Sequence, residues 1–326
     1  MTHVELGLRD VYAARKRISP YVQQTPLVYS RSISHRTGGN VYLKLENQQI
    51  TRSFKVRGAA NRLLRLNEDE RQLGVITVST GNHGKAVATM ANSLGIRAVI
   101  CVPELVLQHK VNAIRDIGAE IVVTGKDQEE AEENALELAE EQGLTYVSPF
   151  DDPDILLGQG TIALEILDEL PEVDHVVVPL SGGGLLSGIA LALKQTDRRI
   201  RTTGVSMDRS PVMYWSVQAG RPIQMPELAT LADSLMGGIG LGNRYTFSLI
   251  RRYMDNAVLV SESEIENAMK HLLIEERLVV EGGGSVGVAA LLHDRVSEPG
   301  DNIVVVVSGG NADMVVVQRL LSDNAT

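Results

Sequence analysis

Residues 175–194 read HVVVPLSGGGLLSGIALALK. The segment 175–180 is largely apolar and rich in valine, which predicts a strand that is buried on both faces. Residues 185–194 have the length and composition of a helix. Between the two stand three consecutive glycines, Gly182, Gly183 and Gly184, at the point where the helix would begin. A buried strand, a glycine loop and a helix in this order are typical of a parallel α/β sheet with helical crossovers.

The same alternation of short apolar runs and longer amphipathic segments continues through most of the chain. Strands are predicted at residues 41–45, 75–79, 98–102, 121–124, 145–147, 202–205, 258–260 and 303–307. Helices are predicted at residues 54–66, 85–94, 110–117, 128–142, 159–170, 212–219, 264–277 and 313–321. The order indicates an α/β fold in which parallel strands are buried between layers of helices.

Two further loops stand between a predicted strand and a helix, namely Ser79-Thr80-Gly81-Asn82-His83-Gly84 and Ser308-Gly309-Gly310-Asn311. Ligands bind at the carboxyl ends of parallel strands, where glycine lets backbone N–H groups come close. Three such loops favour one composite site. The 182–185 loop lacks the lysine of a Walker loop and the spacing of a dinucleotide fingerprint. Its glycines at a helix N-terminus predict a phosphate site, and a tight turn without a ligand is the alternative.

A lysine occupies an unfavourable place in the segment Ser53-Phe54-Lys55-Val56-Arg57-Gly58. At the start of a helix the macrodipole disfavours a positive charge. An amine held in an apolar pocket loses its proton more readily and becomes a nucleophile, as lysines that form Schiff bases do. Lys55 is therefore a candidate nucleophile, and an ordinary surface lysine is the alternative.

Composition excludes several classes of partner. The formal net charge of the 326 residues is −10 and no long basic block is present, so we expect no nucleic-acid partner. A single cysteine, Cys101, lies in a predicted strand; it allows no intrachain disulfide and fits a cytoplasmic protein. No signal peptide and no apolar run near ~18 residues is found, so no membrane association is expected. His109, His271 and His293 lack metal-ligand spacing, and we expect them at the surface, with no metal site.

Together these motifs resemble the fold-type-II pyridoxal-phosphate enzymes, and within them the threonine/serine dehydratase and serine racemase family. The resemblance extends from about residue 10 to about residue 319, and includes the segments 158–165 and 286–290. It implies a tryptophan-synthase-β-like fold with two parallel-sheet α/β domains and pyridoxal 5'-phosphate between them. Residues 1–73 and 150–326 would form the large domain and residues 74–149 a small mobile domain. A homodimer is also implied.

The resemblance further implies roles for individual residues. Lys55 would hold the cofactor covalently and act as the α-proton base, while Phe54 would pack on the pyridine ring. The remaining cofactor contacts would come from Asn82 at the ring hydroxyl, Gly182, Gly183, Gly184 and Leu185 at the phosphate, Ser308 at the pyridine nitrogen and Glu281 near the ring edge. The substrate would be contacted by Ser79, Thr80, Asn82, His83 and Ser234, with Thr80 as a second catalytic candidate. For His83 a purely structural role is an equal alternative.

The expected activity is elimination of water from a β-hydroxy amino acid such as threonine or serine, giving a 2-oxo acid and ammonia. A neutral serine at the pyridine nitrogen leaves the cofactor a weaker electron sink, which favours elimination over transamination. Serine racemases carry serine where this chain has Thr80, which argues against racemase activity. Ser206 stands where some relatives have a metal-binding carboxylate, so no cation site is expected there. The chain also ends soon after the 308–311 loop, so we expect no isoleucine-binding regulatory domain.

Alternative activities stay open. The segment Ala232-Asp233-Ser234 replaces the Ala-Asp-Gly of many relatives and resembles dehydratases of hydroxyectoine catabolism. A 3-hydroxyaspartate dehydratase, a serine racemase, a β-replacement enzyme and a non-catalytic binding protein on the same fold are the other candidates.

Overall fold

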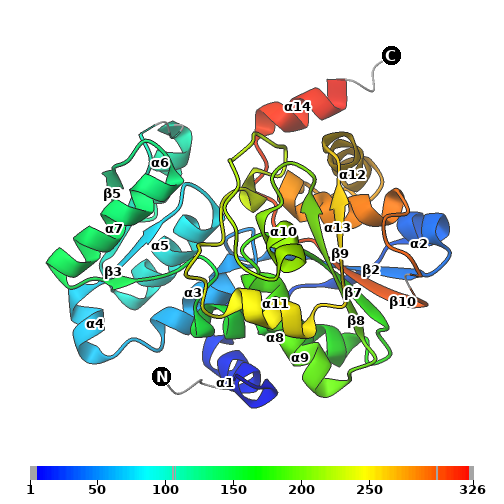
Figure 1. The fold of residues 1–326 in the computed structure, drawn as a ribbon, viewed down its shortest axis with the longest axis horizontal. Coiled ribbons are helices and arrows are strands. Elements are labelled where there is room, and N and C mark those ends of the chain that lie inside the picture. The colour runs from blue at the N-terminus through cyan, green and yellow to red at the C-terminus, as the bar shows by residue number, and fades with distance from the viewer. Residues whose placement is uncertain (1–5, 105, 107, 299, 323–326) are drawn as a thin grey trace.

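Two separate sheets organise the chain (Figure 1). The computed structural model describes residues 6–104, 106, 108–298 and 300–322. One sheet has six strands in the order β1-β2-β10-β7-β8-β9, and the other has four in the order β5-β4-β3-β6. The strands are β1 (Leu27–Tyr29), β2 (Asn40–Lys44), β3 (Val75–Val78), β4 (Ala98–Val102), β5 (Glu120–Val123), β6 (Thr145–Tyr146), β7 (His175–Pro179), β8 (Arg201–Met207), β9 (Asn256–Val260) and β10 (Asn302–Val306).

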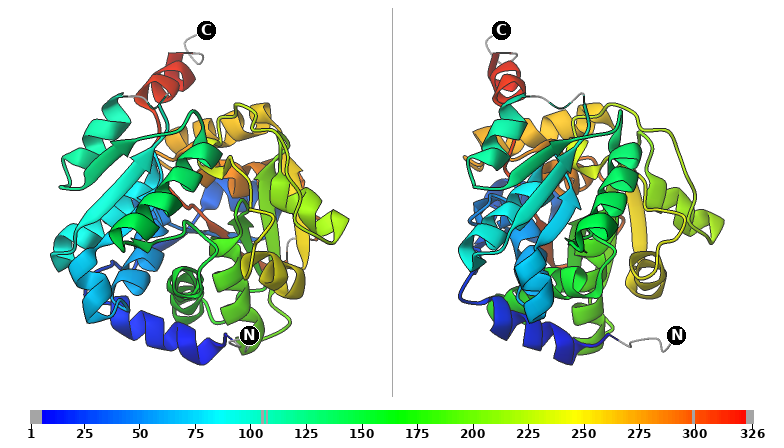
Figure 2. Two further views of the ribbon diagram at one scale, coloured as in Figure 1. Left: turned by 60° about the vertical axis from the view of Figure 1, so that its left-hand side comes forward. Right: turned by 90° about the vertical axis from the view of Figure 1, so that its left-hand side faces the viewer.

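Helices connect most of these strands and cover both faces of the larger sheet. They are α1 (Leu8–Ile18), α2 (Arg31–Thr37), α3 (Lys55–Leu63), α4 (Glu68–Leu73), α5 (Asn82–Leu94), α6 (Gln108–Arg115), α7 (Gln128–Gln142), α8 (Pro153–Glu169), α9 (Gly184–Thr196), α10 (Val212–Ala219), α11 (Thr246–Tyr253), α12 (Glu262–Ile274), α13 (Gly282–Leu292) and α14 (Met314–Ser322). Two short 3₁₀ helices are η1 (Glu46–Gln48) and η2 (Asp233–Leu235). Figure 2 shows that α1 and α14 lie at opposite ends of the molecule.

The strand that the sequence identified first lies inside the larger sheet. Strand β7 pairs in parallel with β10 on one side and β8 on the other. Val176 and Val178 pack against the core beneath α8 and α9, while Val177 packs against the core beneath α13. Successive side chains of a strand point to opposite faces, so both faces of β7 are buried as predicted. All pairings between the predicted strands are parallel, as expected. Among the described strands, the one antiparallel pairing joins β2 to the edge strand β1, which the sequence did not predict.

Every predicted strand and helix is present; β4, α7 and α10 have the predicted ends, and the ends of the others are shifted. Helix α8 begins at Pro153, six residues before the predicted start, because the Asp152 carboxylate accepts hydrogen bonds from the N–H groups of Asp154 and Ile155. An acidic N-cap followed by proline is a strong start signal. Short helices and edge elements were missed: α1, β1, α2, α4, α11 and α13. Helix α13 begins with three glycines, has no polar face and is buried along its length, so neither propensity nor periodicity identifies it.

Glycines allow α8 to pack closely on both of its helical neighbours. A Cβ on Gly188 of α9 would lie 2.0 Å from the carbonyl oxygen of Leu156, and one on Gly158 would lie 2.5 Å from that of Arg57 in α3. No side chain fits at either point. Helix α3 is thereby held against α8, and this contact determines where its first residue, Lys55, is placed.

Replacing Gly188 by Ala should destabilise the protein by about 3 kcal/mol, since the new methyl group overlaps a backbone oxygen that cannot move freely. The measurement is urea denaturation followed by circular dichroism. Gly242→Ala is the matched control, because a Cβ there meets no atom within 4 Å. The control should change the free energy of unfolding by less than about 0.5 kcal/mol. Equal effects of the two substitutions would contradict the close-packing account.

Candidate active site

Lys55 is the first residue of α3, and its helix start is tied to the loop that follows β10. The N–H of Phe54 donates to the carbonyl oxygen of Ser308 at 3.1 Å, and Ser53 forms an isolated antiparallel bridge with Gly309. The ammonium nitrogen of Lys55 donates to the carbonyl oxygen of Pro149 at 2.7 Å. Phe54, Lys55 and Ser308 are therefore adjacent, as predicted for a single site.

Burial changes the acid–base behaviour of Lys55. Loss of hydration lowers the pKa of its amine to about 8, and the negative charge of Glu281 opposes this decrease. An unperturbed lysine titrates near pH ~10.4, so this amine is neutral far more often than a surface lysine at the same pH. A neutral amine can attack an aldehyde or accept a proton.

The glycine loop adjoins Lys55 through Phe150, which follows Pro149 in the chain. A Cβ on Gly182 would lie 2.4 Å from the Phe150 ring, and Gly183 has a left-handed backbone with φ of 86°. The N–H groups of Gly182 to Leu185 have no acceptor among the described residues. They stand at the N-terminus of α9, where the macrodipole adds positive potential. This is the donor set that a phosphate requires.

A hydrogen-bond network joins Asn82 of α5 to the loop after β10. The amide nitrogen of Asn82 donates to Oε1 of Glu281 at 2.7 Å, and its amide oxygen accepts from Asn311 at 2.6 Å. The backbone N–H of Asn311 donates to Oε2 of Glu281 at 3.1 Å. Both predicted residues, Asn82 and Glu281, are thus in contact. Asn311 was not predicted, although its place directly after Gly309-Gly310 could have indicated it.

Glu281 is a buried carboxyl group with an unusual pKa. Burial, assisted by the negative charge of Asp233, raises its pKa to about 7, and hydrogen bonds from Asn82, Ser234 and the Asn311 N–H oppose the increase. Lys55 and Glu281 therefore titrate within about one unit of each other. Groups whose pKa values are displaced in this way are typical of catalytic sites.

The loop between β3 and α5 contributes Ser79 and Thr80, and the first turn of α5 contributes His83. The Ser79 hydroxyl accepts from the N–H of Gly81 at 3.2 Å. His83 is buried, and its Nε2 lies 3.1 Å from the carbonyl oxygen of Val147 while its Nδ1 has no protein partner among the described residues. Burial and the charge of Lys55 lower the pKa of His83 to about 3, so the ring is neutral. The contact with Val147 supports the structural alternative for His83, and the free Nδ1 leaves a ligand contact available.

A buried ion cluster, which the sequence did not reveal, lies directly behind Lys55. The guanidinium of Arg57 donates to Glu46 twice at 2.8 Å and to Glu165 at 2.5 and 2.8 Å. The ammonium nitrogen of Lys44 lies 2.8 Å from Glu165. Burial opposes ionisation of Glu165, but the charges of Arg57 and Lys44 outweigh it, so its pKa is lowered. Lys44 also lies 3.4 Å from the partly exposed Glu169, so two cations meet three carboxylates in this cluster.

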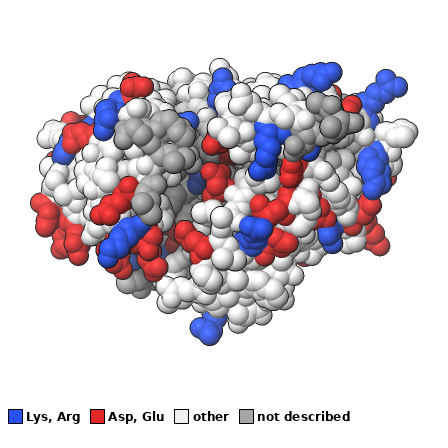
Figure 3. Space-filling view, turned by 90° about the horizontal axis from the view of Figure 1, so that it is seen from above, with Lys and Arg blue, Asp and Glu red and all other residues white. Residues whose placement is uncertain are grey.

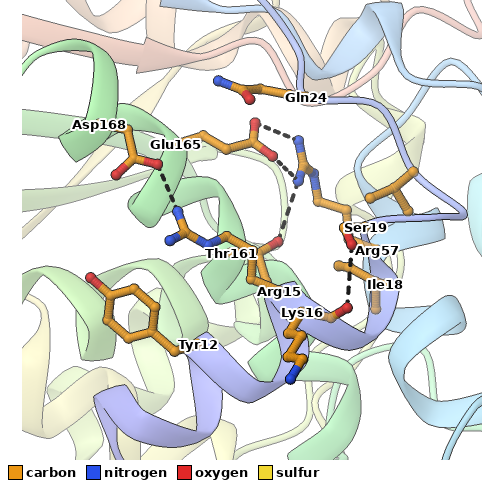
Figure 4. A pocket seen from close by; sticks show the side chains of 11 residues that line it. Tyr12, Arg15, Lys16, Ile18, Ser19, Gln24, Arg57, Thr161, Glu165 and Asp168 are labelled. Atoms are coloured by element: carbon orange, nitrogen blue, oxygen red, sulfur yellow. Dashed lines mark hydrogen bonds and ion pairs between the residues drawn. The ribbon is translucent and has the colours of Figure 1, made fainter.

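A cavity of about 640 Å³ opens beside this cluster, and Figure 4 shows its lining. It lies between α1 and α8, with Arg57, Thr161 and Glu165 at its floor and the Arg15–Asp168 ion pair at its rim. The buried groups at the floor already hydrogen-bond to one another. Among the residues that the structure describes, the floor of the cavity therefore has no free buried donor, in contrast to the glycine loop.

Other predicted features have mixed outcomes. Cys101 is buried in β4 as expected, and burial raises the pKa of its thiol to about 11. The prediction that His271 is a surface residue is wrong, because its ring is half-buried with Nε2 2.7 Å from the Ser32 hydroxyl oxygen. His293 is partly exposed at the end of α13, and the side chain of His109 lies outside the described residues. Within the described ranges, no cluster of three His, Cys, Asp or Glu side chains could hold a metal.

Across the residues that the structure describes, no helix has both the length and the hydropathy to cross a bilayer.

The fold and this geometry define a class of enzyme: an α/β protein that binds a phosphorylated aldehyde through a lysine and a glycine loop. The amine of Lys55, near Pro149, matches the aldehyde of pyridoxal phosphate. The N–H groups at the start of α9, which have no acceptor among the described residues, match its phosphate, and the neighbouring Ser308 matches its ring. Residues 18–309 match the family model described as pyridoxal-phosphate dependent enzyme. The chain belongs to this family, and its cofactor is pyridoxal phosphate.

Individual relatives are similar over nearly the whole chain. A putative threonine dehydratase of Sinorhizobium fredii is 46% identical over 97% of this chain and 96% of its own length. An L-threonine ammonia-lyase of Thermotoga maritima is 40% identical over 97% of this chain and 78% of its own length. The structure of maize serine racemase superposes with a TM-score of 0.91 and 33% identity, covering 97% of each chain. The fold is that of the fold-type-II enzymes, as the sequence motifs predicted.

Replacing Arg57 by Met should destabilise the protein by about 3–5 kcal/mol, because Glu46 would remain buried without a balancing charge and Glu165 would keep only Lys44. Urea denaturation measures the effect. Arg15→Met removes an exposed ion pair with Asp168 and should cost less than about 1 kcal/mol. The account is wrong if the two variants lose similar stability.

Attachment of added pyridoxal phosphate to protein freed of cofactor should accelerate with pH. The rate should be half-maximal near pH 8, because only the neutral amine of Lys55 reacts and its pKa is about 8. Stopped-flow absorbance between about pH 6 and pH 11 measures this profile. Glu281→Gln removes a charge that favours the ammonium form, so it should move the midpoint to lower pH. A midpoint near ~10.4 would mean that Lys55 behaves as an exposed lysine.

Proposed function

We propose that this protein eliminates water from a β-hydroxy amino acid, threonine or serine, to give a 2-oxo acid and ammonia. The observation that carries the proposal is the buried amine of Lys55, with its pKa lowered to about 8, beside a glycine loop with free N–H groups. Two relatives that match 97% of this chain, named putative threonine dehydratase and L-threonine ammonia-lyase, support the choice of substrate.

The residues around Lys55 are proposed to hold the cofactor in a fixed orientation. Gly182 to Leu185 would donate their N–H groups to the phosphate, and Ser308 would face the pyridine nitrogen. Asn82 would turn its amide toward the ring hydroxyl, with Phe54 packed on the ring and Glu281 at its edge. When bound, pyridoxal phosphate withdraws electrons from the α-carbon of the amino acid and so acidifies its α-hydrogen.

Lys55 is the proposed base that removes this hydrogen. Its Nζ would accept the proton, which the low pKa of about 8 permits near neutral pH. Ser79, Thr80, Asn82 and His83 would orient the substrate carboxylate, because they stand at the N-terminus of α5, where the helix dipole and the hydroxyl groups favour an anion. Ser234 would border the β-substituent. Thr80 is proposed as the second candidate for proton transfer.

Residues 74–149 are proposed to form a small domain that closes over the substrate and excludes water. The four-stranded sheet falls inside this range, which supports the division. Helix α3 also packs into the core beneath that sheet, through Val56 and Ala59 against Val75 and Ala86. The base-bearing helix would therefore contact both domains. A homodimer and a cytoplasmic location are further proposals that rest on the family resemblance.

A serine racemase is the second candidate, favoured by the similarity to the maize enzyme. The hydroxyl of Thr80 could serve as a base on the opposite face, although its methyl group takes up space there. Formation of D-serine from L-serine would separate this candidate from the dehydratase.

Lys55→Ala should reduce 2-oxo acid formation at least about a hundredfold, since it removes both the cofactor anchor and the base. The assay follows ammonia release from serine, threonine, 3-hydroxyaspartate and hydroxyectoine-derived acids. Lys16→Ala, at an exposed position of α1, is the control and should keep full activity. Release of ammonia by the Lys55 variant at the wild-type rate would refute the assignment, as would the absence of release from every substrate by the wild type.

A further inference from the structure

We propose that Asp151 is a positioning residue for the cofactor phosphate: its carboxylate fixes the start of α11 against Gly183 and so holds the glycine loop in one conformation. The inference rests on the proposed function, in which Gly182 to Leu185 bind the phosphate. It adds a residue that acts on the cofactor through another segment of the chain.

The Asp151 carboxylate takes the place of an N-cap for α11, although 95 positions separate it from Thr246. Its Oδ1 accepts hydrogen bonds from the N–H groups of Tyr245 and Thr246, both at 2.9 Å, and its Oδ2 accepts from the N–H of Arg244 at 2.6 Å. Tyr245, the residue before the helix, makes no capping hydrogen bond with its own side chain. Backbone N–H groups at a helix start have no partner within the helix, so Asp151 satisfies donors that α11 cannot satisfy itself.

The start of α11 in turn packs against the glycine loop. Thr246 is fully buried, and a Cβ on Gly183 would lie 3.2 Å from Cβ of Thr246 and 3.2 Å from Cγ1 of Ile250. The Ser187 hydroxyl, in the first turn of α9, donates to the carbonyl oxygen of Thr246 at 3.4 Å. Gly183 has a left-handed backbone, with φ of 86°. Displacement of Thr246 would therefore remove a neighbour that confines the Gly183 backbone.

Phe150, the residue before Asp151, holds the other side of the loop. A Cβ on Gly182 would lie 2.4 Å from the Phe150 ring, and one on Gly184 would lie 3.0 Å from the Phe150 Cα. The Ser148 hydroxyl accepts from the N–H of Asp151 at 3.1 Å and so fixes this turn of the chain. The segment 148–151 therefore contacts the glycine loop directly through Phe150 and indirectly through α11.

The geometry of the loop matters because the protein as a whole is acidic, with a formal net charge of −10. Figure 3 shows acidic side chains on both sides of the groove between the lobe of the four-stranded sheet and the rest of the molecule. The phosphate would depend on short-range hydrogen bonds from backbone N–H groups, which weaken steeply when their angle changes. A loop that is held in place before binding also loses less entropy when the phosphate binds.

The charge of Asp151 acts in the opposite direction. A carboxylate near a phosphate repels it, so loss of the charge alone would tighten phosphate binding. The three N–H groups around the carboxylate offset part of this repulsion, and solvent screens the remainder at a half-buried side chain. Loss of a helix cap changes a local equilibrium by about five- to thirtyfold. We therefore expect the loss of positioning to outweigh the loss of repulsion.

Pyridoxal phosphate and pyridoxal provide the test, because they differ only at the phosphate group. Each is titrated into the full-length protein freed of cofactor, and the dissociation constant is read from the absorbance of the bound form. Asp151→Ala should weaken the binding of pyridoxal phosphate at least about fivefold and that of pyridoxal less than about twofold. Asp127→Ala is the matched control, because the Asp127 carboxylate caps α7 by accepting from the N–H of Glu130 at 2.9 Å. The control should leave the ratio of the two dissociation constants unchanged.

Asp151→Asn separates hydrogen bonding from charge. It removes the charge, but its amide oxygen can still accept from Tyr245 and Thr246. This variant should keep the fold and lose only about two- to threefold in the ratio, and it carries the test if Asp151→Ala does not fold. Tighter binding of pyridoxal phosphate by either variant, an unchanged ratio in each folded variant, or equal weakening of both ligands overturns the inference.

Gly183→Ala distinguishes a failure of this inference from a failure of the proposed function. The new methyl group would lie 2.9 Å from Cε of Met213, at a residue with positive φ, so it should distort the loop directly. The preference for pyridoxal phosphate should fall at least about fivefold. If Gly183→Ala leaves the preference unchanged, the proposed phosphate loop is wrong and the inference fails with it. If Gly183→Ala lowers the preference while Asp151→Ala does not, only the positioning role of Asp151 fails.

Discussion

The buried guanidinium of Arg57 is the interaction on which the placement of Lys55 depends. Arg57 stands two residues after Lys55 and binds Glu46 beside β2 and Glu165 of α8. Burial of a cation costs much free energy unless carboxylates pair with it. The first turn of α3 is therefore stable only where the Arg57 guanidinium reaches both Glu46 and Glu165. The glycine contact between α3 and α8 reinforces that position, since Gly158 allows the two backbones to touch. The amine of Lys55 is thereby directed at Pro149 and the glycine loop.

Electrostatic balance links this anchor to the chemistry. In the ion cluster behind Lys55, Arg57 and Lys44 are paired with Glu46, Glu165 and, at its partly exposed edge, Glu169, so the charges largely offset one another. In front, Lys55 and Glu281 face each other in a site where burial lowers the pKa of the amine and raises that of the acid. Each group is thus close to losing its charge near neutral pH. A site of this kind can exchange protons with a substrate at little cost, whereas the same groups in water would stay ionised.

Local patterns predicted much of the molecule. Strand β7 and the loop at Gly183 can be predicted from the sequence, because an apolar run and consecutive glycines determine the local backbone structure within a few residues. The predicted start of α8 is six residues too late, because the Asp152 N-cap, rather than hydrophobic periodicity, determines where that helix begins. The sequence did not predict helix α13, because its first three residues are glycines, which disfavour a helix. Glycine is required at these positions because η2 packs closely against them. The half-buried position of His271 depends on Ser32, more than two hundred residues away, which no local pattern can reveal.

The sequence by itself predicted the fold class and the cofactor, because the alternation of strands and helices and the order of the glycine loops can be read along the chain. It also indicated Lys55 as the candidate nucleophile and Gly182 to Leu185 as the candidate phosphate loop, because each of these depends on residue types within one short segment. The tertiary structure alone decided which charges meet. Arg57 reaches Glu165 across 108 positions, and Asn82 reaches Glu281 across 199. Coulomb and hydrogen-bond energies depend on distance in space, and the chain separates these partners widely before folding brings them together.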